Sequence, residues 1–316
     1  MDLSFRNQLI TVTLACCLCG GCKVAAPIHL WRPPQLASAV GGRVVVSELS
    51  GEGPLVAQVR SKLFESVPSD FGRNIMLVDY RTLSEQGEVK LVSATDEQVN
   101  DLALASLARR SGADFLLRGE VIESRASDYE EALSDQLTIS WSLTSLAADR
   151  EGGGLPVSVT AETAIQRYPD LALLASSDDV LTIAAVRETY RLMLPTVDRE
   201  TIEIESSYAL PGSRELRRAN ELAKSGNWAA AEKRWERVRK DYPFQIAAMH
   251  NLALAAVARQ DYSKAKELAR SAIRFHPSAL HQQTLVWIET RQRAYHKAFG
   301  LPDPPEGWFL TRSEND

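Results

Sequence analysis

The sequence predicts an α+β protein: a mixed α/β domain of sandwich type, followed by an all-α domain of helical hairpins. Two observations predict this. Between residues 43 and 122, short β-branched runs alternate with amphipathic stretches of helical period. Between residues 212 and 277, one pattern of residues occurs twice at a constant spacing. In addition, all four cysteines lie at the start of the chain, the last of them being Cys22, which indicates a leader ahead of both domains.

Composition is that of ordinary globular protein, with 24% charged and 45% hydrophobic residues over 316 positions. The net charge of −5 hides an asymmetry between the two halves. Residues 43–211 hold 15 Lys/Arg against 28 Asp/Glu, whereas residues 212–299 hold 17 against 8. Either the domains are simply solvated with opposite signs, or they attract each other, or the basic half meets an acidic partner. We expect no nucleic-acid partner.

The leader combines an apolar stretch over residues 9–19 with the small pair Gly20-Gly21 before Cys22. That stretch suits a signal peptide and is too short to span a bilayer. It resembles a bacterial lipoprotein signal, which implies a signal peptide over residues 1–22 and acylation of Cys22. The resemblance implies a lipid-anchored protein of the cell envelope, and Lys23 after the cysteine favours the outer membrane.

Three alternatives to this interpretation of the leader remain. Ala15-Cys16 offers a second cleavage site, and a cleaved protein without lipid would be secreted or periplasmic. A metal site at the clustered cysteines is disfavoured because they sit inside an apolar leader with no histidine nearby. We therefore expect neither a metal nor a cofactor.

Residues 23–42 are predicted to form an extended tether, because they contain Pro27, Pro33, Pro34 and a Gly41-Gly42 pair. The α/β domain follows over residues 43–211. Strands are expected at 43–49, 74–79, 113–122, 136–146, 157–167 and 198–209, and helices at 56–66, 96–111 and 178–194. The alternation in residues 136–146 predicts a half-buried antiparallel strand, so we expect a sheet with an antiparallel meander and helices on one side.

This domain resembles a group of envelope proteins comprising the N-terminal domain of TolB, the curli-secretion lipoprotein and the lipoprotein activators of penicillin-binding proteins. The resemblance rests on Val44-Val45-Val46, on Gly51, on Val78-Asp79-Tyr80 and on residues 111–121, Ser-Gly-Ala-Asp-Phe-Leu-Leu-Arg-Gly-Glu-Val. It covers residues 43–209 and concerns the fold more than any activity.

No catalytic constellation is visible in the sequence. The glycines around Glu52 and at residues 152–154 lack the Lys-Ser/Thr of a phosphate loop. The carboxylate pairs Glu130-Glu131 and Asp178-Asp179 are adjacent, so their side chains do not face one another. We expect the protein not to be an enzyme.

The repeat aligns Gly226-Asn227-Trp228 with Gln260-Asp261-Tyr262, and Tyr242-Pro243 with His276-Pro277, always 34 positions apart. It resembles the tetratricopeptide repeat, which implies helical hairpins at 212–243 and 246–277, a capping helix at 278–299 and an irregular tail at 300–316. The expected packing residues are Ala219, Trp228, Ala231, Ala253, Tyr262 and Ala265.

Asn220 and Asn251 stand at the places where one subfamily of these repeats clamps the carboxylate of a peptide, but the matching basic places hold Leu216, His281 and Leu285. The clamp is therefore incomplete, and the surface beside it is apolar. This apolar surface could hold an amphipathic segment of a partner or pack against the α/β domain. The candidate peptide groove consists of Leu216, Asn220, His250, Asn251, Leu254 and Val257.

Together these features favour a non-enzymatic, lipid-anchored envelope protein that binds a protein or peptide partner through its repeats. The alternative is an oligomeric component of a secretion pore, similar to the curli-secretion lipoprotein. That alternative needs strands able to enter a membrane, and residues 136–146 offer only a short alternating segment.

Overall fold

The structure is a computed structural model that describes residues 24–51, 53–70, 72–86, 97–124, 135–147 and 152–309. The predicted signal peptide, Cys22, the Glu130-Glu131 pair and residues 310–316 lie outside the described residues. The chain divides into two compact units. The α/β unit is Pro33–Thr196, and the helical unit combines the segments on either side of it. A mixed α/β sheet followed by stacked helices confirms the predicted fold class.

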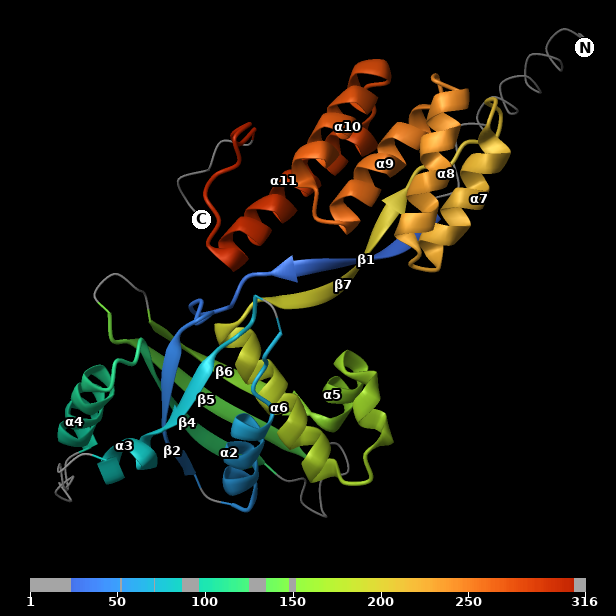
Figure 1. The fold of residues 1–316 in the computed structure, drawn as a ribbon. Helices are drawn as coiled ribbons and strands as arrows, with labels where there is room; N and C mark the ends of the chain where they lie inside the picture. The colour runs from blue at the N-terminus through green and yellow to red at the C-terminus, as the bar shows by residue number, and fades with distance from the viewer. Residues whose placement is uncertain are drawn as a thin grey trace, which may run out of the picture. The chain divides into compact units, whose positions relative to one another are not determined.

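The α/β unit is built on a five-stranded sheet with the order β3-β2-β4-β5-β6 (Figure 1). Its strands are β2 (Arg43–Gly51), β3 (Met76–Asp79), β4 (Phe115–Ser124), β5 (Gln136–Ser145) and β6 (Gly153–Thr160). The first three run parallel, and β4, β5 and β6 form an antiparallel meander. Leu137, Ile139, Trp141 and Leu143 are all buried, which confirms the period-two prediction for β5.

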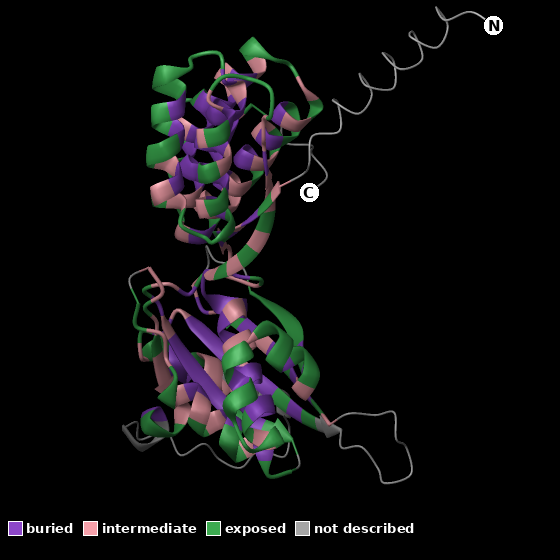
Figure 2. Cartoon of the chain, turned by 90° about the vertical axis from the view of Figure 1, so that its right-hand side faces the viewer, coloured by how far each residue is buried: buried purple, intermediate pink, exposed green. Residues whose placement is uncertain are grey.

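Helices cover both faces of this sheet, whereas the sequence predicted one (Figure 2). The larger core joins the sheet to α2 (Leu55–Glu65) and α6 (Ser177–Met193). The smaller core joins the opposite face to α3 (Tyr80–Gln86) and α4 (Glu97–Arg110). The physical reason lies in β2, where Val44 and Val46 face one core and Val45 faces the other. An unbroken apolar run is what a parallel strand buried on both faces requires.

Two short helical segments follow β6 and were not predicted. The α5 helix (Ala161–Arg167) begins with a capping box in which the hydroxyl of Thr160 accepts from the backbone of Thr163. The 3-10 helix η1 (Pro169–Leu173) follows it, with its proline in the first turn. The strand expected over residues 157–167 therefore ends at Thr160, because a threonine that can cap a helix starts one there.

The helical unit contains five helices in the described part of the chain. They are α7 (Ser213–Lys224), α8 (Trp228–Asp241), α9 (Ile246–Ala258), α10 (Tyr262–Phe275) and α11 (Ala279–Phe299). Each helix packs against the next, so α7–α8 and α9–α10 form two successive hairpins with α11 beside them.

The turns of the two hairpins are the same in detail. Gly226 has φ 82°, and Gln260, its counterpart in the second hairpin, has φ 68°. Asn227 and Asp261 then cap the following helices by accepting from the backbone N–H groups of Ala230 and Lys264. A left-handed residue followed by an Asx cap ends one helix and starts the next within a few positions. The period of the sequence is thus also a period of the structure.

The segment predicted as a tether begins with a strand instead. Strand β1 (Val24–Arg32) pairs with β7 (Thr196–Ile204) in a two-stranded sheet (Figure 1). Both strands belong to the helical unit, with β7 doing so from Val197 onward. The boundary between units therefore falls near residue 196, not at 211. The buried set Ala26, Ile28 and Leu30 explains the difference, because a period-two apolar face must be covered.

The end of the described chain folds back onto α10 and α11. The Lys266 ammonium, fully buried, lies 2.8 Å from a carboxylate oxygen of Glu306. The backbone N–H of Phe309 donates to the Glu289 carboxylate at 2.8 Å. Burial would raise the pKa of Glu306, but its hydrogen bonds, that from Lys266 first, lower this pKa to about 2. The tail from residue 300 thus covers the last hairpin.

Candidate functional site

The residues predicted to line a peptide groove share one face of the helical stack, which we call the inner face. It consists of Leu216 and Asn220 on α7 and of His250, Asn251, Leu254 and Val257 on α9. All six side chains are buried. The predicted packing residues Ala219, Ala231, Ala253, Tyr262 and Ala265 are buried in the same core, and Trp228 packs against it.

What covers the inner face is the chain itself. The apolar side of β1 belongs to the same core as the inner helices, and β1 contacts α7, α9 and α11. The indole N–H of Trp228 donates to the carbonyl of Pro27 at 2.7 Å, which fixes β1 against the first hairpin. The sequence left open whether this face receives a partner segment or another domain, and in the structure a strand from the start of the chain lies there.

Directly after β7, the backbone of Glu205 is held by the two asparagines of the inner face. Asn251 accepts from the N–H of Glu205 at 2.8 Å and donates to its carbonyl at 2.8 Å. Asn220 donates to the same carbonyl at 3.0 Å. An amide that pairs with both backbone groups of one residue recognises an extended chain independently of its side chains.

The carboxylate of Glu205 is bound as well. His281, on α11, places its Nε2 atom 2.9 Å from a carboxylate oxygen of Glu205, while its Nδ1 atom lies 2.8 Å from the carbonyl of His276. Three successive inner helices therefore each contribute one polar group to a single residue. His281 is one of the residues that the sequence placed at a basic position of the incomplete clamp, and in the structure it binds the carboxylate of Glu205.

A buried hydrogen-bond network supports these contacts. Asn220 Oδ1 accepts from the Trp235 indole at 3.0 Å and from Asn251 at 3.1 Å. His250 Nδ1 lies 3.2 Å from Asn251 Oδ1, and His250 Nε2 lies 2.9 Å from the Thr284 hydroxyl. Because Asn251 Oδ1 can only accept, His250 carries its proton on Nδ1 and accepts from Thr284 on Nε2. A satisfied network of this kind fixes both asparagines in one orientation.

The titratable groups of the inner face differ in their pKa values. Burial lowers the pKa of His250 to about 4, so this ring is neutral near pH 7. Burial would also lower the pKa of His281, but its bonds to Glu205 and to the His276 carbonyl outweigh that effect and raise it. Likewise, burial would raise the pKa of Glu205, and its bond to His281 and the nearby histidines bring it below its ordinary value. Glu205 and His281 therefore stabilise each other's charged forms.

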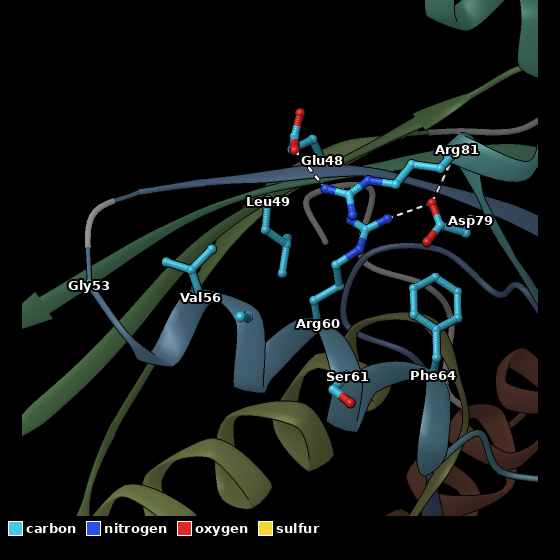
Figure 3. A pocket seen from close by; sticks show the side chains of 10 residues that line it. Glu48, Leu49, Gly53, Val56, Arg60, Ser61, Phe64, Asp79 and Arg81 are labelled. Carbon is cyan, nitrogen blue, oxygen red and sulfur yellow. Dashed lines mark hydrogen bonds and ion pairs between the residues drawn. The ribbon is translucent and has the colours of Figure 1, made fainter. Parts of the chain in front are cut away.

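A second candidate site lies in the α/β unit, at the carboxyl ends of β2 and β3. A cavity of about 450 Å³ opens there between the sheet and α2 (Figure 3). Its charged lining consists of Glu48 on β2, Arg60 on α2, Asp79 at the end of β3 and Arg81 in the first turn of α3. Ligands of open α/β sheets commonly bind outside the carboxyl ends of parallel strands.

The charges of this cavity are paired with one another. Arg60 binds the carboxylate of Asp79 at 2.5 Å and the carbonyl of Ser47 at 2.9 Å. Arg81 binds Glu48 at 2.8 Å, and the Tyr80 hydroxyl donates to the other Glu48 oxygen at 3.0 Å. The hydrogen bonds from Arg81 and Tyr80 hold the pKa of Glu48 below its usual value. Two carboxylates and two guanidinium groups that neutralise each other make no strong site for an ion of either sign.

Sequence reasoning missed Glu205, Thr284 and the four charged residues of the cavity. The cavity had a signal, since Glu48 and Asp79 both stand near the carboxyl ends of predicted strands. Glu205 had no signal in the sequence, because only the fold brings this residue into contact with residues 220, 251 and 281. Within the described residues, no group of three or more His, Cys, Asp and Glu side chains is placed to hold a metal ion. None of the helices described combines the length and apolar character needed to cross a bilayer.

Neither a protein-family model nor a curated protein matches the chain. Several solved structures resemble its α/β part at a distance. A PelC dodecamer from Paraburkholderia phytofirmans is 13% identical and covers 54% of this chain and 98% of its own, with a TM-score of 0.29. Lipoprotein GNA1162 from Neisseria meningitidis is 13% identical and covers 43% and 99%, with a TM-score of 0.26.

The C-terminal domain of LpoB from Salmonella enterica is 12% identical and covers 39% of this chain and 84% of its own, with a TM-score of 0.25. All three are distant resemblances of fold. They carry no information about what this chain binds.

Proposed function

We propose that the protein is a non-enzymatic lipoprotein of the cell envelope. It is anchored to the membrane through Cys22, and it binds a partner through a short stack of tetratricopeptide-type repeats. It thus serves as a protein-interaction or assembly module. Its partner is a protein or peptide of the envelope, and it needs no cofactor, metal or nucleic acid.

The observation that carries this proposal is the binding of the Glu205 backbone by two asparagine side chains. Two asparagines, one per hairpin and 31 positions apart, hold an extended backbone on the inner face of a repeated helical stack. Peptide-binding repeats use this arrangement on a partner. Here the same arrangement holds the chain's own segment, so a partner either uses another surface of the helical unit or displaces this segment.

The absence of an enzymatic role rests on chemistry. On the inner face the Thr284 hydroxyl donates to neutral His250, but both side chains are buried, which leaves a substrate no access to them. The cavity of the α/β unit carries charges that are already neutralised in pairs. Glu205 and His281 on the inner face likewise stabilise each other's charged forms, so neither carries a free charge for proton transfer.

Two experiments test the proposal. Metabolic labelling with palmitate should mark the parent protein and fail in Cys22→Ser, whereas labelling that persists in this variant would exclude the anchor. Crosslinking mass spectrometry in cells should then join lysines of the helical unit, such as Lys233 and Lys240, reproducibly to one envelope protein. Crosslinks confined to the chain itself would exclude an interaction module.

The second candidate function is an oligomeric component of a secretion pore. The observation that favours it is the alternation of buried residues with more exposed ones along β5 and at the end of β6. Light scattering distinguishes the two functions, because a ring of many copies has a mass far above that of one or two chains.

A further inference from the structure

One end of the helical stack exposes a group of large apolar side chains. Here α8 and α10 end, and α7, α9 and α11 begin, since neighbouring helices run antiparallel. The connecting segments carry aromatic and aliphatic residues that point into solvent. We call the following set the loop-end patch: Tyr208, Leu210, Tyr242, Phe244 and Phe275. Phe244 is 82% exposed, and Phe275 is 59% exposed.

The segment before α7 and the connection between α8 and α9, which carry four of these five side chains, lie side by side. The side-chain amide of Gln245 donates to the carbonyl of Pro211 at 3.1 Å, which joins the connection before α7 to the connection between α8 and α9. The ring of Tyr242 lies directly against Gly212, so closely that a Cβ atom at this glycine would overlap the ring. Exposed rings on adjacent connections form one surface, and such surfaces mark interaction sites.

Cations surround the patch. The last turn of α8 carries Arg239 and Lys240, and the last turn of α10 carries Arg274. All three are exposed, and none forms an ion pair with a described carboxylate. The described carboxylates near them are Asp241 at the end of α8 and Glu267 on α10, whose pKa is lowered mainly by Lys264 and further by Arg239 and Arg274. Aromatic rings bordered by unpaired Lys and Arg suit the interface of an anionic membrane, where rings enter the headgroup region and cations meet the lipid phosphates.

The start of the chain places the helical unit near such a surface. Val24, the first residue of β1, stands two positions after Cys22. Two residues of extended chain reach roughly 7 Å at most. If Cys22 carries the lipid, the helical unit that includes β1 has no tether and lies against the bilayer. This step rests on the proposed function, whereas the patch and its cations do not.

We propose that the loop-end patch binds the surface of an anionic phospholipid membrane, as a second contact beside the lipid anchor. The rings of Phe244 and Phe275 enter the headgroup region, and Arg239, Lys240 and Arg274 lie at the level of the phosphates. The helical unit is then oriented on the membrane rather than free to rotate about its anchor.

The test uses the full chain with Cys22→Ser, which cannot be acylated at that residue. Flotation measures its partition into vesicles of phosphatidylcholine alone and of phosphatidylcholine mixed with phosphatidylglycerol. We expect binding to the mixed vesicles that weakens with salt. Adding Phe244→Ser should reduce the partition about tenfold, because one inserted ring is lost. Adding Lys240→Gln should reduce it about fivefold, since one cation near an anionic surface contributes about 1 kcal/mol.

Matched controls are available in the same chain. Leu173, 89% exposed on η1 of the α/β unit, provides Leu173→Ser, and Lys297, exposed in the last turn of α11, provides Lys297→Gln. Neither should change the partition. Every variant keeps the same apolar leader, so any difference among them arises from the substituted residue.

Equal partition of Phe244→Ser and its parent would overturn the proposal, and so would equal binding to neutral and anionic vesicles. A fall in molar mass in Phe244→Ser, with vesicle binding unchanged, would instead identify the patch as a contact between two copies and would also overturn it. Because the test chain lacks Cys22, its result is independent of palmitate labelling. A failure of the anchor and a failure of the patch are therefore distinguishable.

Discussion

The inner face and the loop-end patch belong to the same helical unit and differ in almost every physical respect. On the inner face, polar side chains such as Asn220 and Asn251 are buried and bonded to the chain's own backbone. At the loop end, apolar rings such as Phe244 are exposed, and none of the neighbouring cations forms an ion pair with a carboxylate in the described part of the chain. The surface that a repeat is expected to offer a partner is thus already covered by the chain itself, whereas the loop-end patch stays exposed.

Removing the central amide of the inner face should have the largest effect on stability. Asn251→Ala leaves the N–H of Glu205 and the Nδ1 atom of His250 without their partner, and it removes one of two hydrogen bonds to the Glu205 carbonyl and one of two to Asn220 Oδ1. We expect a loss of about 3 kcal/mol in the free energy of unfolding of the helical unit, measured by urea titration. Gln282→Ala, at an exposed position of α11, should change it by less than about 0.5 kcal/mol. Equal losses of unfolding free energy in Asn251→Ala and Gln282→Ala would show that the buried amide contributes no more than an exposed side chain.

The inner face should also make the helical unit sensitive to acid. His250 has a pKa of about 4 in the fold and an ordinary value of 6.5. The unfolded chain therefore takes up this proton first, and stability falls as the pH drops from 6.5 to 4, by about 3 kcal/mol in the limit. His250→Gln should flatten this part of the profile of unfolding free energy against pH.

His281 acts in the opposite sense. Its pKa is raised in the fold, so its contribution is present below pH 6.5 and is lost as the pH rises through the folded value. His281→Gln should remove that loss at higher pH and leave the acid branch in place. If His250→Gln and His281→Gln both keep the parent's profile of unfolding free energy against pH, the opposite roles assigned to these two histidines are wrong.

A smaller effect distinguishes the two hairpins. Gln260 occupies the left-handed conformation that Gly226 supplies in the first hairpin. Gln260→Gly should therefore raise the melting temperature, with a gain of about 0.5 kcal/mol, whereas Gly226→Ala should cost about 1 kcal/mol. Effects of the same sign at both positions would show that the turns are not equivalent.

The smallest effect is expected at the loop end. Phe244→Ser should alter the free energy of unfolding by less than about 0.5 kcal/mol, because the ring is 82% exposed and packs on little. Far-UV circular dichroism during thermal unfolding measures this. A large loss would mean that Phe244 belongs to the core and not to a surface.

The sequence predicted the local structure well where one periodicity dominates. The alternation in β5 and the repeat of the two hairpins located their elements, and Asn220 and Asn251, which the sequence singled out together, bond each other in the structure. Helices on both sheet faces were missed, although the unbroken Val44–Val46 run indicates burial on both sides. Such a run does not say which helices cover it.

The long-range pairings were beyond sequence reasoning. The pairing of β1 with β7 joins the start of the chain to the segment that follows the whole α/β unit, and the prolines around Trp31 favoured a tether. The period-two set Ala26, Ile28 and Leu30 was the signal that could have identified a strand. The occupant of the inner face, Glu205, is set by where β7 ends against the helices, which no local pattern encodes.

Hydrogen exchange at Glu205 tests most directly whether the chain occupies its own inner face. We expect this amide, which donates to Asn251 Oδ1, to exchange slowly in the parent protein and rapidly in Asn251→Ala, with the exposed connection at Tyr208 rapid in both. If the amide of Glu205 exchanges as fast as that connection in the parent protein, the inner face is open and the chain does not occupy it.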